Sequence, residues 1–201
     1  MKKAGNITRK KILNTAIKIF SEKGFLATRI SDISKEAGIA HGLLYYYFKD
    51  KEHILQAIFE ENWKDLIKNI NQVIEHNTSV QERISAILSF IFHLFYNHPD
   101  LFRVIVINLR YNPEGKKYIR GELLQEFLQP LYKLFVEGQK EGVFRKDIEP
   151  EVAIDFLFGT VENSIRNILT GVSKFKLEID DLYKIKESIL KIFYNGVLEE
   201  S

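Results

Sequence analysis

Residues 28–52 of this chain read TRISDISKEAGIAHGLLYYYFKDKE and predict two short helices separated by a turn at Gly38. Three apolar residues recur at helical spacing on one face of the first segment: Ile30, Ile33 and Ala37. Glycine readily adopts the left-handed conformation that ends a helix, and a second helix is expected to follow over about 41–47. Two helices of this size predict a helix-turn-helix, in which the second helix presents its first residues to DNA base edges.

The residues before this stretch predict one further helix. Five apolar residues fall on one face of it: Ile12, Leu13, Ala16, Ile17 and Phe20. Gly24 is expected to end this helix, and Phe25 is expected to fold back onto it. Together with the two helices of residues 28–52, it forms a small three-helix head.

The rest of the chain shows only helical periodicity, and six more helices are expected. Their approximate ranges are 50–76, 79–97, 100–111, 117–140, 150–169 and 179–198. Asp50 is an expected N-cap, and Ser79 with Glu82 predicts a capping box at the start of another helix. Pro130 is expected to kink the helix that contains it. The sequence therefore predicts an all-α fold of about nine helices, with a helix-turn-helix DNA-binding domain over 1–53 and a larger ligand-binding and dimerisation body over 54–201.

Charge is distributed unevenly, although the net charge of the chain is only +2. Residues 1–55 carry eleven Lys and Arg against five Asp and Glu, whereas the remaining residues carry eighteen against twenty-two. A basic head on an acidic body favours a DNA-binding module joined to a domain with another task, because basic side chains neutralise DNA phosphates. The charge pattern alone is equally compatible with a solvated surface. A non-specific architectural DNA-binding protein, the main competing class, is expected to be basic throughout.

Composition argues against several other classes of protein. The chain has no cysteine, which excludes a disulfide framework and a thiolate metal site, and its longest apolar runs are too short to cross a bilayer. No uninterrupted apolar segment lies near Met1, so we expect no signal peptide, no membrane contact and a cytoplasmic location. We find no Gly-rich phosphate loop and no Ser, His and Asp grouping in a recognisable context. The sequence therefore predicts no enzyme, no cofactor and no bound metal.

A wider pattern around the helix-turn-helix resembles the TetR family of one-component bacterial transcription regulators. The matching residues are Gly24, Phe25, Thr28, Asp32, Ile33, 37–39, 42–49, Lys51 and Glu52. The resemblance covers about residues 8–55, and beyond them only the number and lengths of the helices match. It implies a homodimer that binds a palindromic double-stranded DNA operator, acts as a repressor, and releases the operator when a small molecule enters the body.

Four residues at the start of the second helix are the expected base-proximal positions: Ala40, His41, Gly42 and Leu43. Among these, only His41 offers a hydrogen bond to a base edge, so DNA shape is expected to contribute to specificity. His41 also has a simpler interpretation as an exposed histidine. Leu44 and Phe48, one helical turn apart, are expected to lie in the core.

Phosphate contacts are expected on both sides of the turn. Thr28 and Ser31 open the first helix of the pair, where side-chain hydroxyls reach the DNA backbone. The family resemblance implies further phosphate contacts at Tyr45, Tyr46 or Tyr47, and Lys51. Three consecutive tyrosines on a helix cannot all face one way, so at least one is expected to pack inward.

Polar side chains inside the apolar body helices are candidates for effector binding, because a buried polar group needs a hydrogen-bond partner. Together with nearby aromatic residues, the expected set is Phe92, Tyr96, Arg103, Asn108, Arg110, Phe127, Glu162, Asn163 and Arg166. Each of them is also compatible with core packing, intramolecular pairing or exposure. Segments 101–110 and 158–162 resemble regulators of fatty-acid metabolism, which implies a long-chain acyl-coenzyme A effector. A multidrug-type cavity would show the same aromatic content.

Two faces of the last two helices predict a dimer interface. The expected residues are Phe156, Gly159, Thr160, Asn163, Leu182, Ile185, Ile189, Ile192 and Phe193. Two copies of these faces would form a two-fold four-helix interface. The apolar stripe of the last helix is also compatible with packing against the chain's own body.

Overall fold

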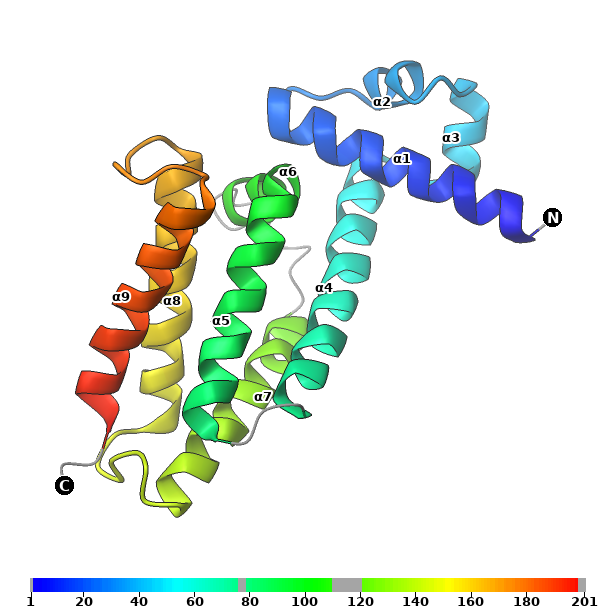
Figure 1. Cartoon of the computed structure of the whole chain (residues 1–201). Helices are drawn as coiled ribbons and strands as arrows, with labels where there is room; N and C mark the ends of the chain where they lie inside the picture. The colour runs from blue at the N-terminus through cyan, green and yellow to red at the C-terminus, as the bar shows by residue number, and fades with distance from the viewer. Residues whose placement is uncertain (1, 76–78, 110–120, 199–201) are drawn as a thin grey trace. The chain divides into compact units, whose positions relative to one another are not determined.

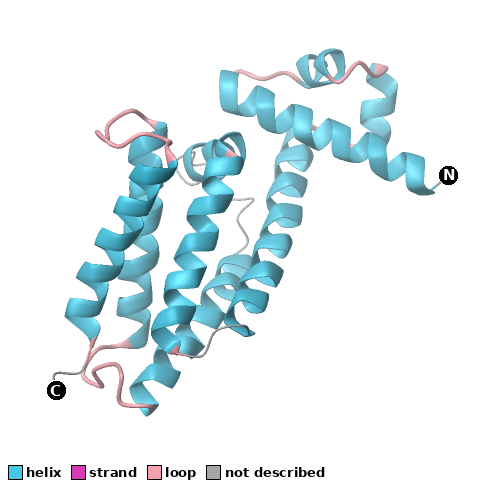
Figure 2. Cartoon of the chain, in the orientation of Figure 1, coloured by secondary structure: helices cyan, strands magenta, loops and turns pink. Residues whose placement is uncertain are grey.

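The described part of the chain is helical. The computed structural model describes residues 2–75, 79–109 and 121–198. Within these ranges the chain forms nine α-helices and one π-helical segment without any β-strand, which confirms the predicted all-α fold (Figure 2). No helix in the same ranges combines the length and the apolar character that are needed to cross a bilayer.

The chain folds as two compact units. One consists of Met1–Lys64 with Asp100–Arg120, and the other of Asp65–Pro99 with Gly121–Ser201. The long helix α4 (Lys51–Glu75) begins in the first unit and ends in the second. The functional boundary expected after residue 53 stays a prediction, because α4 starts before it and continues through it.

The first unit contains the predicted head. Its helices are α1 (Lys2–Lys23), α2 (Ile30–Glu36), α3 (His41–Tyr47), the start of α4, α6 (Pro99–Phe102) and the π-helix η1 (Arg103–Leu109). Helix α1 packs against α2 and η1, and α2 packs against α3 (Figure 1). Four of the five apolar residues predicted for the buried face of α1 are buried: Ile12, Leu13, Ala16 and Phe20. The fifth, Ile17, is half-buried.

The turns of the head follow the predicted glycine positions. Gly24 ends α1 with a φ of 81°, and Gly38 ends α2 with a φ of 60°, both in the left-handed region that favours glycine. The Phe25 ring lies edge-on to Phe20 with 5.2 Å between centroids, as expected from its position after Gly24. Asp50 is the predicted N-cap of α4, since its Oδ1 accepts a 2.7 Å hydrogen bond from the His53 amide.

The segment after Pro99 differs from the single α-helix that we expected. It forms one α-helical turn, α6, followed by seven π-helical residues in η1. Residues 104–107 are all β-branched, and such side chains crowd the preceding turn of an α-helix. A wider helix relieves this crowding, which gives a physical reason for the difference. The helix expected over 117–140 is described from Gly121 onward and contains Pro130 as predicted.

The second unit is a bundle of long helices. They are the end of α4, α5 (Val80–Asn97), α7 (Gly121–Lys140), α8 (Pro150–Leu169) and α9 (Ile179–Val197). Helix α5 packs against α7 and α9, while α8 packs against both of these helices. The predicted capping box opens α5, because Ser79 Oγ accepts from the Glu82 amide and Glu82 accepts from the Ser79 amide.

Candidate nucleic-acid interface and effector site

Helix α3 presents the predicted base-proximal residues on the surface of the head. Ala40 is its N-cap, and residues 40–43 are all exposed. Leu44 and Phe48 are fully buried, which confirms the prediction that they belong to the core. These two side chains anchor α3 in the core of the head, whereas the first turn of this helix remains exposed.

The three tyrosines of α3 have different environments. Tyr46 is 80% exposed and Tyr45 is half-exposed, whereas Tyr47 is half-buried. The Tyr47 hydroxyl approaches Gly5 of α1, where an added Cβ atom would lie 3.5 Å from it. Tyr47 is therefore the tyrosine that packs inward. Tyr45 lies edge-on to His41 with 5.0 Å between ring centroids, so it orients the one base-proximal side chain that can form a side-chain hydrogen bond.

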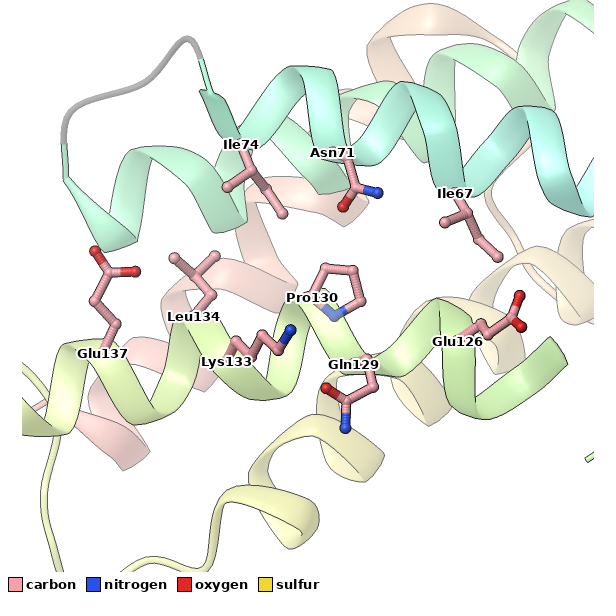
Figure 3. A pocket seen from close by; sticks show the side chains of 9 residues that line it. All are labelled: Ile67, Asn71, Ile74, Glu126, Gln129, Pro130, Lys133, Leu134 and Glu137. Atoms are coloured by element: carbon pink, nitrogen blue, oxygen red, sulfur yellow. The ribbon is translucent and has the colours of Figure 1, made fainter. Parts of the chain in front are cut away.

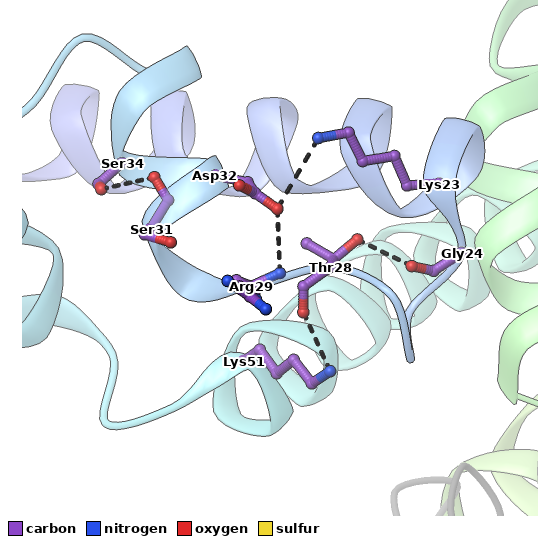
Figure 4. A network of polar contacts seen from close by, with 8 residues as sticks. All are labelled: Lys23, Gly24, Thr28, Arg29, Ser31, Asp32, Ser34 and Lys51. Carbon is purple, nitrogen blue, oxygen red and sulfur yellow. Dashed lines mark hydrogen bonds and ion pairs between the residues drawn. The ribbon is translucent and has the colours of Figure 1, made fainter.

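The start of α2 is held by a small polar network (Figure 4). The amide of Arg29 donates a 3.2 Å hydrogen bond to Asp32 Oδ2, which also lies 3.8 Å from Lys23 Nζ. Ser31 is exposed, as a phosphate contact requires. Thr28 is only 1% exposed, and its hydroxyl donates a 2.8 Å hydrogen bond to the Gly24 carbonyl. Thr28 thus closes the turn after α1, and its expected contact with a phosphate stays a prediction.

Arg29 is a candidate that sequence reasoning missed. It is the exposed N-cap residue of α2 and carries a charge where that helix begins. Helix N-termini and arginine side chains both favour phosphate groups. The signal in the sequence that could have identified Arg29 is its position as a basic residue directly before a predicted helix.

The Lys51 side chain lies against the turn between α1 and α2, and its expected contact with a phosphate stays a prediction. Its Nζ donates to the carbonyl oxygens of Phe25 at 2.9 Å, Leu26 at 3.2 Å and Thr28 at 3.0 Å. The ammonium also lies 4.6 Å from the centroid of the Phe25 ring. Lys51 therefore ties the first turn of α4 to the turn between α1 and α2.

In the second unit, a hollow of about 520 Å³ lies between α4 and α7 (Figure 3). Its lining residues are Ile67, Asn71, Ile74, Glu126, Gln129, Pro130, Lys133, Leu134 and Glu137. Pro130, which cannot donate a hydrogen bond to the carbonyl one turn earlier in α7, is among the residues that line this space. Glu137 is held by Arg83, which donates to both of its carboxylate oxygens at 2.8 and 3.0 Å.

A second hollow, of about 690 Å³, lies between α7 and α8. Glu126 and Gln129 line both spaces, so the N-terminal half of α7 separates them. The second hollow is more acidic, since Glu151 and Asp155 of α8 also line it. An anionic group is therefore better accommodated in the first hollow, beside Lys133.

The predicted effector residues are not gathered in the hollow between α4 and α7. Seven of the nine have described side chains, and none of these seven lines it. Phe92 and Tyr96 line a smaller groove between α5 and α9, while Phe127 is buried against Phe158. Glu162 is also buried, whereas Asn163 is exposed and accepts a hydrogen bond from Arg166.

The other predicted effector residues lie elsewhere. Arg103 is half-buried in η1 of the first unit. The side chains of Asn108 and Arg110 lie outside the described residues. Sequence reasoning missed Asn71 and Lys133, because it searched for polar residues inside apolar stretches rather than beside the predicted kink at Pro130.

The predicted dimer face needs a correction for α9. Leu182, Ile185, Ile189 and Phe193 are buried within their own chain, where α9 packs against α5 and α8. An apolar stripe at helical spacing can pack against a helix of the same chain or against a partner chain. In this protein the stripe of α9 packs against helices of its own chain. The residues of the predicted set that remain available are Phe156, Gly159, Thr160, Asn163 and Ile192.

A basic head that carries a helix-turn-helix and continues through α4 into a helical body is typical of a regulator that binds DNA. The chain belongs to the tetR family of bacterial regulatory proteins, whose profile matches residues 12–58. The profile described as the C-terminal region of YsiA-like proteins matches residues 59–195. The first match covers most of the stretch 8–55 that carries the family resemblance, and the chain is a helix-turn-helix transcription regulator.

Relatives with known roles are similar over most of the chain. The fatty acid metabolism regulator protein of Bacillus subtilis (strain 168) is 26% identical over 92% of this chain and 93% of its own. The HTH-type transcriptional repressor KstR2 of Rhodococcus jostii (strain RHA1) is 27% identical over 79% of this chain and 78% of its own.

Two solved structures have the same fold. The fatty acid degradation regulator FadR from Bacillus halodurans superposes with a TM-score of 0.85, at 26% identity over 94% of this chain and 95% of its own. FadR from Bacillus subtilis in complex with stearoyl-CoA has a TM-score of 0.83, at 27% identity over 93% of this chain and 98% of its own.

Proposed function

We propose that this chain is a homodimeric repressor that binds an inverted-repeat operator and releases it when a long-chain acyl-coenzyme A binds in the body. The observation that carries the proposal is the similarity, over 93% of the chain, to a regulator whose structure contains stearoyl-CoA. The hollow between α4 and α7 supports it, because apolar walls and polar groups occur together there. Its volume of about 520 Å³ falls within the range of small-molecule sites.

Lys133 is the residue that we assign to the anionic part of the effector. Figure 3 shows its side chain on α7 between Gln129 and Leu134, at the edge of the hollow. The walls across the hollow are apolar at Ile67 and Ile74 of α4, which suits an acyl chain. An ammonium beside an apolar surface recognises a ligand that is both anionic and apolar.

Helix α4 is the element through which binding would reach the head. It lines the hollow with Ile67, Asn71 and Ile74, and its first turn carries Lys51, which contacts the turn after α1. An effector that binds one position of α4 more tightly than another shifts the population toward that position. Operator and effector affinities must then change by the same factor.

A dimer is needed because a single head contacts too few base pairs, whereas two heads read two half-sites. Phe156 and Ile192 are exposed apolar residues on α8 and α9, and they remain available for a partner chain. Gly159 on α8 has no atom within 4 Å of an added Cβ, which leaves space for a partner helix to approach. The mass of the protein in solution, measured by light scattering with and without operator, tests this part of the proposal.

The proposal is tested with a labelled duplex that the wild-type chain selects from randomised DNA. Stearoyl-CoA is expected to lower the affinity for this duplex about tenfold or more, and the duplex should lower stearoyl-CoA affinity equally. Coenzyme A and stearate, added separately, show which part of the molecule is required. If a cationic dye releases the duplex and stearoyl-CoA does not, the chain is a multidrug-type sensor instead. A chain that selects no sequence from randomised DNA would fit an architectural role.

Lys133→Gln is expected to weaken stearoyl-CoA binding about tenfold while leaving operator affinity unchanged. The variant keeps a polar side chain but removes the charge, and a hydrogen bond to an anion is stronger when its donor is charged. Isothermal titration of the purified protein measures the change. Lys140→Gln is the matched control, since Lys140 is exposed at the end of the same helix and does not line the hollow. Equal losses in both variants would remove Lys133 from the site.

A further inference from the structure

Lys51 has all of its hydrogen-bonding capacity directed into the protein. An ammonium group has three N–H donors and no acceptor. Three carbonyl oxygens, those of Phe25, Leu26 and Thr28, lie 2.9 to 3.2 Å from Nζ. The number of acceptors equals the number of donors, and the Phe25 ring covers the same group at 4.6 Å. A DNA phosphate would have to displace at least one of these partners.

The three carbonyls belong to one short turn. It begins at Gly24, whose positive φ ends α1, and it leads directly to Arg29, the N-cap of α2. Within it, the Thr28 hydroxyl donates to the Gly24 carbonyl, and the Thr28 amide donates to the Phe25 carbonyl at 3.3 Å. Carbonyl groups turned to the same side form a negative site that a cation stabilises. Figure 4 shows Lys51 reaching this turn from α4.

The turn determines where α2 begins. Arg29 and Ser31 follow it at once and are both exposed at the start of that helix. A shift of the turn would move both side chains relative to α3, which carries the base-proximal residues. The position of Lys51 therefore bears on how the two helices of the motif meet the DNA together.

We propose that Lys51 is a positioning residue for DNA binding, which holds the α1–α2 turn on the first turn of α4 and does not itself bind a phosphate. The inference rests on the DNA-binding part of the proposed function and is independent of the effector. Because Lys51 belongs to α4, a displacement of this helix reaches the start of α2 through three hydrogen bonds. The same contact thereby links the helix that lines the hollow to the DNA-binding surface.

The salt dependence of DNA binding separates a positioning residue from a phosphate ligand. The logarithm of the DNA-binding constant falls as the logarithm of the salt concentration rises. Each phosphate that a protein neutralises makes this fall steeper by about 0.9. Lys51→Met in the full chain is expected to lower the affinity for a fixed mixed-sequence duplex about tenfold, with the slope unchanged. Lys49→Met is the matched comparison, because Lys49 lies two residues away and is exposed. A salt dependence less steep by about 0.9 in this variant is the signature of a lost phosphate contact.

Two further measurements complete the test. Circular dichroism identifies the temperature at which Lys51→Met is fully folded, and the affinity is measured there. Lys51→Arg, which retains several N–H donors, is expected to recover most of the affinity. If Lys51→Met does not fold, Lys51→Gln provides the same slope comparison without the charge.

Two results would overturn the proposal. One is a salt dependence of DNA binding that is less steep by about 0.9 in Lys51→Met or Lys51→Gln, since Lys51 would then be a phosphate ligand. The other is wild-type affinity in the fully folded Lys51→Met protein, since the contact would then serve stability alone. A wild-type chain that binds no duplex contradicts the proposed function itself, and this result is distinct from both.

Discussion

Replacing His41 with alanine is expected to change the preference between operators about ten- to a hundredfold, at the base pair that lies beneath this residue. His41 is exposed in the first turn of α3, and its ring is held edge-on by Tyr45, with centroids 5.0 Å apart. Ala40, Gly42 and Leu43, which surround it, have no side-chain hydrogen-bonding group. Removing the imidazole therefore removes the one side-chain hydrogen bond that this turn offers to a base edge.

The measurement is a selection from randomised duplexes, followed by titration of the best and the singly substituted sites. Tyr45→Phe and Tyr46→Phe are the comparison variants. In each variant only the hydroxyl is lost, and the Tyr45→Phe variant keeps the ring that packs against His41. Both changes are therefore expected to weaken binding to all sequences alike, as the loss of a phosphate contact does. A change of preference in the tyrosine variants with none in His41→Ala would contradict this division of roles.

Gly138→Ala is expected to lower the free energy of unfolding by about 3 kcal/mol. Gly138 is buried in α7, and an added Cβ would lie 2.3 and 2.5 Å from two ring atoms of Phe144. The ring cannot easily retreat, because it is buried and stacks on Phe135 with 4.9 Å between centroids. The backbone is also fixed, since the amides of Val143 and Phe144 donate to the Gly138 carbonyl at 2.8 and 3.1 Å.

Gly159→Ala is the matched control for this prediction. Gly159 lies inside α8, and no atom lies within 4 Å of an added Cβ. Alanine loses less conformational entropy than glycine in a helix, so this variant is expected to gain about 0.5–1 kcal/mol. Urea unfolding followed by circular dichroism measures both changes. Equal behaviour of the two variants would show that the contact with Phe144 does not govern stability. Light scattering checks that the oligomeric state stays constant, because Gly159 also belongs to the predicted dimer face.

Local features of the sequence predicted the head well. The ends of α1 and α2 lie at Gly24 and Gly38, where a left-handed backbone is needed. The burial of Leu44 and Phe48 also followed from their spacing of one helical turn. These features depend on residues close to each other in the chain, where backbone conformation and side-chain periodicity are the deciding factors.

The proposed effector site was not predictable in the same way. Lys133 and Asn71 line the same hollow because α7 and α4 border it. The short-range pattern around either residue does not specify which helix lies opposite, although Lys133 closely follows the predicted kink at Pro130. The sequence also did not show which helices cover the apolar stripe of α9. Its spacing predicts that one face is covered, but the pattern is identical whether the cover is α5 and α8 or a partner chain.

By itself, the sequence determined that the chain is helical, where its head begins and turns, and that it resembles a DNA-binding regulator. These properties follow from periodicity, caps and glycine positions, which act over a few residues. The tertiary structure alone decided that Lys51 faces the carbonyls of the α1–α2 turn and that α9 uses its apolar stripe internally. Each of these depends on which distant side chains and carbonyls meet after packing, and short-range patterns carry no information about that.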